Sequence, residues 1–327
     1  MDLSPFSCQT AENLNVHRYN RPAMIDYDRY DWVGTVFSFR GTALRRAAGR
    51  VLVLTLFAVA VQIVYETGER IGWPRIDLRF GLEPVEHAVL GSLLGFLIVF
   101  RMNASNNRYW EGRTMWAQVI YASRNLVRVG TEHTDEGADL ANLVSGFAIT
   151  LRRSLQGHMD TDETEEFLPE VLRRQANRFG NPPTAIAAAI SEWIGRNRRS
   201  GKIEAQVLRQ MEDQLSKLVE AQSGCEKIRK TPLPFAYVVM IKQLILIYLM
   251  TMPIAVCIPC GWWSPLLVCV VSLGLFGMEE ASVEIEDPFG TRENCLDMVA
   301  YTITIARDTG QIAARKAGGM STVETAG

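Results

Sequence analysis

The sequence predicts an all-α integral membrane protein with four transmembrane helices and a large cytoplasmic helical region. Two observations predict this fold class. The 36 residues between Lys242 and Glu279 contain no Asp, Glu, Lys or Arg, and one bilayer crossing needs about 20 predominantly apolar residues. The middle of the chain, roughly 101–230, is strongly polar and shows helical spacing without strand-like alternation. A purely soluble enzyme and a fully embedded transporter are both excluded as first interpretations.

The chain begins with a predicted cytoplasmic N-terminal segment, residues 1–42. This segment is polar and has no apolar core, so we expect no cleavable signal peptide. The first span follows, because residues 51–65 carry no charge. Arg46 and Arg50, just before this run, can extend their charged ends toward lipid headgroups. With residues 43–49 included, the segment is long enough to cross a bilayer.

The second span is predicted over residues 88–100, between Glu86 and Arg101. This run is short for a crossing, and polar residues extend it. It therefore suits the interior of a helix bundle or the wall of a pore better than a position surrounded by lipid. Gly91 and Gly95 form a GxxxG pattern within it, which favours the close approach of a second helix.

The third span runs over about 235–257 and the fourth over about 263–278. Pro259 and Gly261 lie between them and predict a tight reversal of the chain. Lys242 is an ionisable residue inside the third span. Such a residue either extends its charged end to the interface or takes part in function.

A helical region is predicted between the second and third spans. Apolar residues recur there at helical spacing. The expected helices cover residues 107–129, 161–177, 184–196 and 203–230. Residues from 310 onward are expected to form a disordered tail.

Lysine and arginine residues determine the predicted topology. They cluster before the first span, after the second and before the third, and the positive-inside rule assigns these sites to the cytoplasm. Four spans then place both termini in the cytoplasm and make this a multi-pass protein of the cell membrane. The predicted parts are the N-terminal segment 1–42, spans one and two at 43–105 with an extracytoplasmic loop at 66–87, the cytoplasmic helical region 106–233, spans three and four at 234–282, and the cytoplasmic C-terminal segment 283–327, disordered at its end.

The charge balance and the motif content exclude several classes of function. The chain has 34 basic and 36 acidic residues, so no net positive field attracts nucleic acid. It contains no H-E-x-x-H, G-x-S-x-G or G-x-x-x-x-G-K-[ST] motif. We therefore expect neither an enzyme nor a bound metal or cofactor.

Two groups of residues are candidates for function. Ser92, Phe96 and Phe100 lie four residues apart in the second span and share one helix face. This face is either an aromatic stripe buried against a neighbouring helix or one subunit's part of a narrow hydrophobic constriction. The acidic residues that begin at Glu279 end the fourth span, and they form either a solvated face or a vestibule that attracts cations.

Two motifs resemble those of a known family. Residues 101–116 read RMNASNNRYWEGRTMW and residues 286–290 read EDPFG, each after an apolar helix. Over about residues 28–310, the chain resembles the bacterial bestrophin-like channels. The motif positions are Arg101, Asn103, Arg108, Trp110, Glu111, Arg113, Trp116, Asp287, Pro288, Phe289 and Gly290.

The resemblance implies a homopentamer with one central ion pathway, in a bacterial inner membrane. It implies a hydrophobic neck at Ser92, Phe96 and Phe100, and a narrower cytoplasmic aperture at Val207. The first neck position is usually apolar in the family, so Ser92 departs from the pattern and predicts a wetter outer end. Eukaryotic members bind calcium just after the Pro-Phe-Gly sequence. Residues 291–294 offer one Glu there, and calcium takes about six to eight oxygen ligands, so calcium gating is not expected.

The implied function is passive ion conduction, with chloride or other monovalent anions as the expected permeant ions. The expected partners are other copies of the chain, the lipid bilayer and the permeating inorganic ions. Aromatic ring edges at the neck favour anions, whereas the acidic end of the fourth span favours monovalent cations such as sodium. Two alternatives of other classes remain: a carrier, which would favour broken helices and internal inverted repeats, and a membrane-anchored helical scaffold or sensor.

Overall fold

The computed structural model describes residues 28, 30–38, 41–71 and 84–318. The elements within these ranges are helices and include no strand, which confirms the all-α prediction. The helices form two compact units. We call the unit built from residues 25–109 and 232–287 the apolar unit, and the unit built mainly from residues 110–231 and 288–327 the polar unit.

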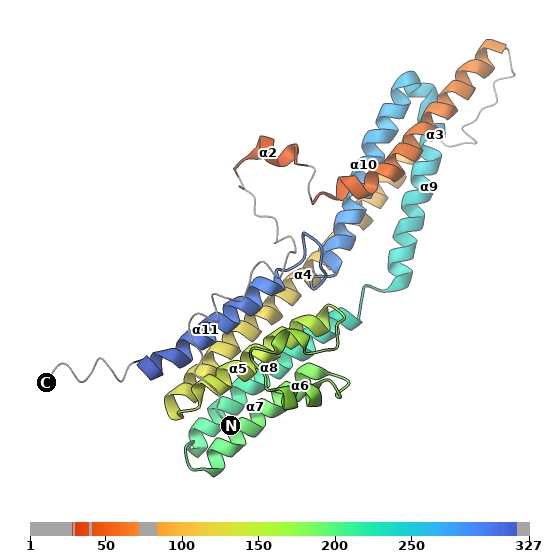
Figure 1. Cartoon of the computed structure of the whole chain (residues 1–327). Coiled ribbons are helices and arrows are strands. Elements are labelled where there is room, and N and C mark those ends of the chain that lie inside the picture. The colour runs from red at the N-terminus through yellow and green to blue at the C-terminus, as the bar shows by residue number, and fades with distance from the viewer. Residues whose placement is uncertain (1–27, 29, 39–40, 72–83, 319–327) are drawn as a thin grey trace. The chain divides into compact units, whose positions relative to one another are not determined.

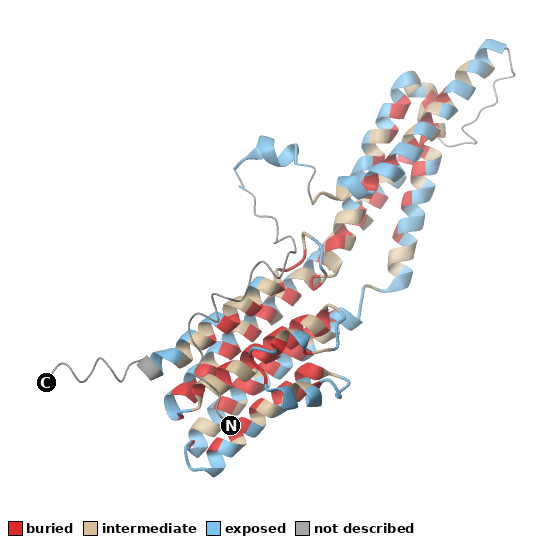
Figure 2. Cartoon of the chain, viewed as in Figure 1, coloured by how far each residue is buried: buried red, intermediate tan, exposed pale blue. Residues whose placement is uncertain are grey.

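The apolar unit consists of long helices that pack side by side and one five-residue helix, α2 (Trp32–Val36), that stands apart from them (Figure 1). The long helices are α3 (Ala43–Ile71), the first half of α4 (Pro84–His133), α9 (Phe235–Cys260) and α10 (Ser264–Glu286), with the short 3-10 turn η3 (Gly261–Trp263) between the last two. Helices α3, α9 and α10 all contact one another. Leu54, Ile98 and Ile245 belong to the core between the long helices, while the outer faces are largely exposed (Figure 2).

Within the residues that the structure describes, three segments are long and apolar enough to cross a membrane, Ala43–Ile71, Pro84–His133 and Phe235–Glu286. The third contains 52 residues, but the chain reverses direction within it at Gly261, where φ is +52°. Glycine suits this backbone conformation because it has no Cβ. Helices α9 and α10 are therefore antiparallel, with the reversal that Pro259 and Gly261 predict (Figure 1).

Helix α4 is longer than the sequence analysis predicts. The second span and the helix after it form one uninterrupted helix of 50 residues, because residues 102–109 contain no Pro or Gly to break it. Helix α3 also continues to Ile71, and α4 begins at Pro84, a residue type favoured in a first helical turn. Helices α3 and α4 therefore extend into both ends of the predicted loop 66–87, whose centre, 72–83, lies outside the described residues.

The polar unit is a bundle of shorter helices beside the second half of α4 (Figure 1). They are α5 (Gly137–Leu155), η2 (Asp162–Thr164), α6 (Glu170–Ala176), α7 (Pro182–Arg199), α8 (Ala205–Lys230) and α11 (Met298–Gly318). Helix α5 packs against both α7 and α11, so most of its residues are buried. Trp116, Phe147 and Trp193 are among the large aromatic residues of this core.

Two predictions for the polar unit are wrong. The helix expected over residues 161–177 is interrupted, because η2 ends at Thr164 and α6 begins only after Pro169, which cannot donate a backbone hydrogen bond. Residues 310–318, expected in a disordered tail, belong to α11. Thr309 explains this order: it is buried, and its Oγ1 lies 3.2 Å from Ser145 Oγ in α5.

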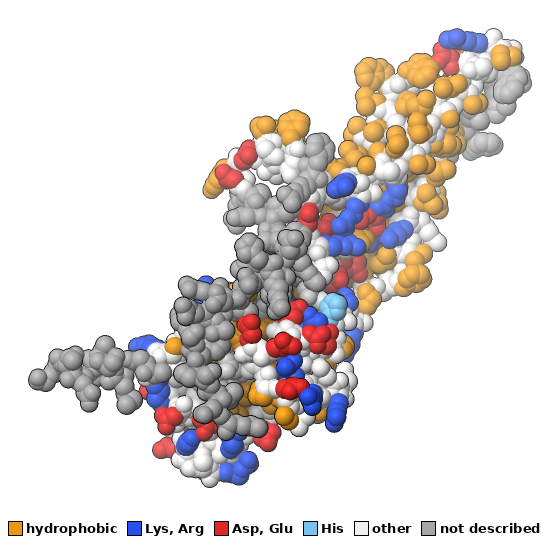
Figure 3. All heavy atoms as spheres, in the orientation of Figure 1, with side chains coloured by type: hydrophobic (Ala, Val, Ile, Leu, Met, Phe, Trp, Pro, Cys, Tyr) orange, Lys and Arg blue, Asp and Glu red, His pale blue; other side chains and the backbone are white. Residues whose placement is uncertain are grey.

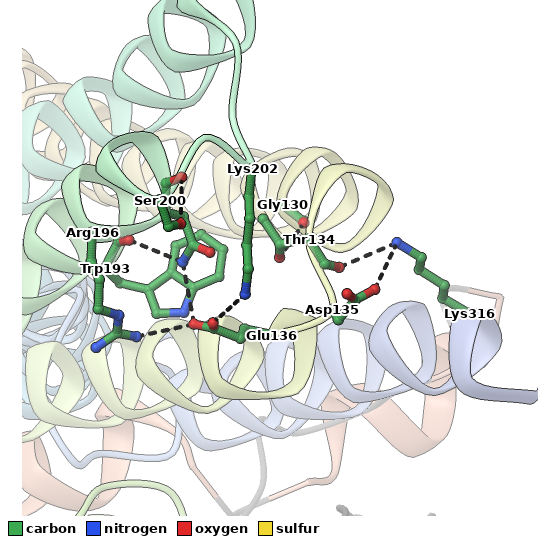
Figure 4. Close-up of polar contacts among 10 residues, drawn as sticks. Gly130, Thr134, Asp135, Glu136, Trp193, Arg196, Ser200, Lys202 and Lys316 are labelled. Carbon is green, nitrogen blue, oxygen red and sulfur yellow. Dashed lines mark hydrogen bonds and ion pairs between the residues drawn. The ribbon is translucent and has the colours of Figure 1, made fainter.

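An ion-pair network at one end of the polar unit holds the turn between α7 and α8 (Figure 4). Glu136, next to the start of α5, accepts hydrogen bonds from Lys202 Nζ at 2.7 Å and Arg196 Nη2 at 3.2 Å. The bond from Lys202 is the largest cause of a pKa of Glu136 below its usual value. The turn contains Gly201 at a φ of +78°, and the network therefore fixes the start of α8, the helix that carries Val207.

Candidate functional site

A layer of charges crosses the apolar unit. The contributors are Arg50 from α3, Arg101 from α4, Lys242 from α9 and Glu279 from α10. Glu279 Oε1 lies 3.1 Å from Arg101 Nη1 and 3.4 Å from Lys242 Nζ. Glu279 Oε2 lies 3.4 Å from Arg50 Nη1. The side chains of Arg101 and Glu279 are only 1% and 3% exposed, and buried charges require such pairing because desolvation is costly.

Further ion pairs extend this layer along α10. Arg46 has one guanidinium nitrogen 3.7 Å from Glu280 and the other 3.7 Å from Glu284. Arg50 also pairs with Glu280. The seven residues that we call the charged layer are Arg46, Arg50, Arg101, Lys242, Glu279, Glu280 and Glu284. Its four cations exceed its three carboxylates by one positive charge.

Polar contacts continue from this layer along the packed faces of α4 and α10. Ser105 Oγ lies 2.9 Å from Ser282 Oγ, and both side chains are buried. Arg108 Nε donates to the backbone oxygen of Glu286 at 3.1 Å. The motif residues Arg101 and Arg108 therefore hold α4 against α10.

These ion pairs correct the interpretation of the acidic end of the fourth span. Glu279 and Glu284 are buried, and Glu280 is mostly so. Each pairs with at least one arginine. These three carboxylates therefore form neither a solvated acidic face nor a vestibule that attracts cations. Lys242 is 53% exposed, as an interfacial lysine would be, yet its ammonium group pairs with Glu279.

The predicted neck residues lie on an exposed face of α4. Phe96 is 62% and Phe100 is 53% exposed. Their rings contact each other edge to face, with centroids 4.7 Å apart and an interplanar angle of 88°. Ser92 is also exposed, and its Oγ donates to the backbone oxygen of Ala88 at 2.9 Å.

The two glycines of the GxxxG pattern have different surroundings. A Cβ added to Gly91 would lie 2.6 Å from the Tyr248 hydroxyl of α9, whereas a Cβ on Gly95 would have nothing within 4 Å. The Tyr248 ring is held by His87, on which it stacks at 4.7 Å. Of these two glycines, Gly91 is therefore the one at which a neighbouring helix of the same chain approaches closely.

Val207, the predicted aperture residue, lies in the first turn of α8 and is half-buried. It belongs to the polar unit, whereas Ser92, Phe96 and Phe100 belong to the apolar unit.

Several motif residues have packing roles in the polar unit. Phe289 is fully buried, and its ring lies against Gly112, where an added Cβ would be 3.1 Å from Phe289 Cζ and 2.9 Å from Pro288 Cγ. The Arg113 guanidinium lies over the ring of Tyr301 at 4.8 Å, and the same ring contacts the buried Trp116.

The remaining motif residues are more accessible. Glu111 pairs with Lys227 of α8 at 2.7 Å. Asn103 and Trp110 are exposed on α4, and Asp287 and Gly290 are half-buried beside the Pro-Phe pair.

Comparison with known proteins agrees with this architecture. The sequence model of the bacterial and fungal bestrophin proteins matches residues 24–311. A voltage-dependent anion channel-forming protein of Nostoc is 30% identical over 290 residues, which cover 85% of this chain and 90% of that protein. A protein of the same description from Synechocystis is 31% identical over 284 residues, which cover 83% and 89%. These relatives are channel-forming proteins rather than enzymes.

A solved structure is similar as well. The crystal structure of a bacterial bestrophin homologue from Klebsiella pneumoniae aligns with a TM-score of 0.75 at 25% identity, over 82% of this chain and 98% of that one. The match of residues 24–311 includes both sequence motifs, 101–116 and 286–290. The resemblance inferred from those motifs is confirmed, and the chain belongs to the bacterial and fungal bestrophin family.

Proposed function

We propose that this protein is a passive anion channel of bestrophin type, which conducts chloride or other monovalent anions through the central pore of a homopentamer. The observation that carries the proposal is the exposed aromatic face of α4. Phe96 and Phe100 are exposed there, whereas Leu94 and Ile98 on the opposite face are buried. An apolar face that its own chain leaves uncovered requires lipid or further copies to cover it. Copies arranged around an axis would join these faces into a hydrophobic neck that gates by dewetting.

Each predicted pore residue has a role in this mechanism. Ions would pass a cytoplasmic aperture formed by the Val207 side chains and then the neck. Phe100 and Phe96 would form the narrow apolar part, where an ion must shed water. Ser92 would form the outer end, and its oxygen can still accept a hydrogen bond from water, because the hydroxyl proton is directed to Ala88.

The membrane topology in this proposal has four spans, formed by α3, the first half of α4, α9 and α10, with both termini in the cytoplasm. The reversal at Gly261 supports this count, because it divides the longest apolar segment into helices of 26 and 23 residues. Each is about the length that a bilayer crossing requires.

Anion selectivity is supported by the charge around the neck. Arg101 directly follows Phe100, and the charged layer to which it belongs has one excess positive charge. The alternative of cation selectivity requires accessible carboxylates at the end of α10. The first three carboxylates there are instead paired with arginines. The curated relatives are described as anion channel-forming. Ring edges of Phe96 and Phe100 would present partial positive charge to an anion.

The test is a reversal-potential measurement on purified protein in liposomes under a KCl gradient. We expect a potential close to that of chloride, and a potential close to that of potassium would contradict anion selectivity. The double variant Phe96→Ala with Phe100→Ala should raise the chloride conductance, because the neck becomes wider and less apolar.

The matched control is Leu52→Ala with Leu56→Ala, which removes two exposed apolar side chains from α3. We expect its conductance to equal that of the unaltered protein. Equal effects of the two double variants on conductance would contradict the assignment of the neck to α4.

A further inference from the structure

The outer surface of the apolar unit ends in charged side chains. Exposed apolar residues cover the outer faces of its helices, including Leu52 and Leu56 on α3, Leu246 and Ile247 on α9, and Val270 on α10. Figure 3 shows hydrophobic side chains over much of one face of this unit, with a group of Lys, Arg, Asp and Glu side chains at its lower end in this view. The charged layer contributes to this group.

The position of this layer matches the edge of a bilayer core. The uncharged runs that extend from it are 51–65 in α3, 243–260 in α9 and 264–278 in α10. At about 1.5 Å per residue these runs span about 22 to 27 Å, close to the hydrocarbon thickness of about 30 Å. Once the apolar surface is embedded, the cations therefore lie at the level of the phosphate groups.

The cations of the layer are accessible, whereas their carboxylate partners are not. The side chains of Arg46, Arg50 and Lys242 are 42%, 44% and 53% exposed. Glu279 is buried, and its two carboxylate oxygens form ion pairs with Arg50 and Lys242. Arg50 also pairs with Glu280 and lies over the ring of Phe276. Its side chain and that of Lys242 are nevertheless about half exposed, so part of each cation stays open to the surface. Among the paired groups of this layer, one positive charge remains unbalanced.

We propose that Arg50 and Lys242, assisted by Arg46, bind the phosphate of an anionic phospholipid at the inner edge of the apolar surface. Arg50 and Lys242 pair with the two oxygens of one carboxylate, so the two cations flank the same group and one phosphodiester would contact both. Its single negative charge matches the excess charge of the layer, and arginine and lysine both bind phosphate well. The acyl chains would lie along the exposed apolar residues of α3 and α9.

This site differs from simple extension of basic side chains into the headgroup region. Extension of the side chains alone would not discriminate between lipids, because it requires only water and headgroups near the charge. A bridged phosphate with excess positive charge prefers lipids with a net negative headgroup. The inference requires the apolar unit to lie in a bilayer, and it is independent of which ion the channel conducts.

The test measures lipid binding to the full chain in detergent. Phosphatidylglycerol and phosphatidylcholine with the same acyl chains are added separately, and retained lipids are counted by native mass spectrometry alongside the melting temperature. We expect stronger retention of phosphatidylglycerol and a higher melting temperature with it. Lys242→Gln and Arg50→Gln should each weaken this retention about fivefold, since each cation near the surface contributes roughly 1 kcal/mol.

The variants have matched controls. Arg70→Gln removes a cation from the opposite end of α3, where Arg70 also pairs with a glutamate at 2.6 Å, and should leave retention unchanged. Lys242→Arg keeps the charge and should retain the lipid. The melting temperatures of Lys242→Gln and Arg50→Gln in phosphatidylcholine show whether the variants still fold. We expect them to fold, because Glu279 keeps Arg101 as a partner in both.

Three results would overturn the proposal. Equal retention of the two lipids, or retention unaffected by Lys242→Gln and Arg50→Gln, would reduce these side chains to general interfacial residues. A melting shift of the same size with inorganic phosphate alone would identify an anion site without a lipid. A changed oligomer mass with unchanged lipid retention would mean that another copy of the chain covers this face. Because chloride flux is measured separately, failure of the lipid site leaves the proposed channel function untouched.

Discussion

At the scale of single residues, Glu279 is a buried carboxylate with three cationic partners. One buried carboxylate is the common partner of Arg101, Arg50 and Lys242, which come from three different helices. Arg101 is almost completely buried, so it depends on this partner more than the other two cations do. Removing one member of a buried ion pair costs roughly 3–5 kcal/mol, because the other charge is left uncompensated.

Glu279→Gln should therefore lower the stability of the apolar unit by roughly that amount, 3–5 kcal/mol. Glu280→Gln is the matched control, because its partners Arg46 and Arg50 are nearly half exposed, and such pairs contribute about 0–1 kcal/mol. Denaturant unfolding of both variants in the same detergent compares the two losses. Similar losses would mean that Arg101 does not depend on Glu279.

The sequence could indicate these residues but not their pairing. Lys242 stands out because it interrupts an apolar run, and Arg101 because it ends one. The partners Arg101 and Glu279 are 178 residues apart, so no local spacing connects them. The sequence alone therefore left the acidic residues open to solvated or cation-binding interpretations that the structure replaces with ion pairs.

At the scale of the elements, α4 is the helix that both units share. Its early residues Leu94 and Ile98 belong to the core of the apolar unit, and Trp116 and Leu126 are buried in the polar unit. Helical spacing predicts both stretches. Their continuity could not be predicted, because polar residues 102–109 look like the boundary of a span, while nothing in them stops a helix.

The contact between α4 and α9 gives a prediction for one side of α4. Gly91→Ala should destabilise the apolar unit by roughly 1–3 kcal/mol, because the new methyl group meets a Tyr248 ring that stacks on His87. Gly95→Ala is the matched control on the same helix, since nothing lies within 4 Å of its added Cβ. Its stability should match that of the unaltered protein or slightly exceed it, because alanine favours helix.

Melting temperatures of the two glycine variants in detergent provide the comparison. A loss confined to Gly95→Ala would indicate that a neighbouring copy, rather than α9, makes the close helix contact.

At the scale of the whole molecule, the proposed pore depends on how copies of the chain assemble. The sequence predicts the spans and the polar region from composition, but the pentamer comes only from the family resemblance. In the proposed homopentamer, four of the five helix faces that line the pore belong to neighbouring copies. Phe96 and Phe100 are exposed in a single chain in either case, whether lipid or other copies cover them. The two cases differ in whether a reagent dissolved in water can reach these positions.

Thiol chemistry can make this distinction. Phe100→Cys places a thiol in the proposed neck, and Leu56→Cys places one on an exposed apolar position of α3. A negatively charged methanethiosulfonate reagent reaches thiols in a water-filled pathway but is excluded from lipid, because burying its charge is costly. We expect it to reduce chloride flux severalfold in Phe100→Cys and to leave Leu56→Cys unchanged.

The native cysteines permit this experiment, because among the described residues Cys225, Cys257 and Cys295 are buried while Cys260 and Cys269 are half-buried. The unaltered protein, treated in parallel, measures their contribution. Modification of Leu56→Cys with equal loss of flux would place α3 rather than α4 along the pathway. If Phe100→Cys stays unmodified in a preparation that conducts chloride, the aromatic face of α4 is covered by lipid, and the pore is lined by another surface.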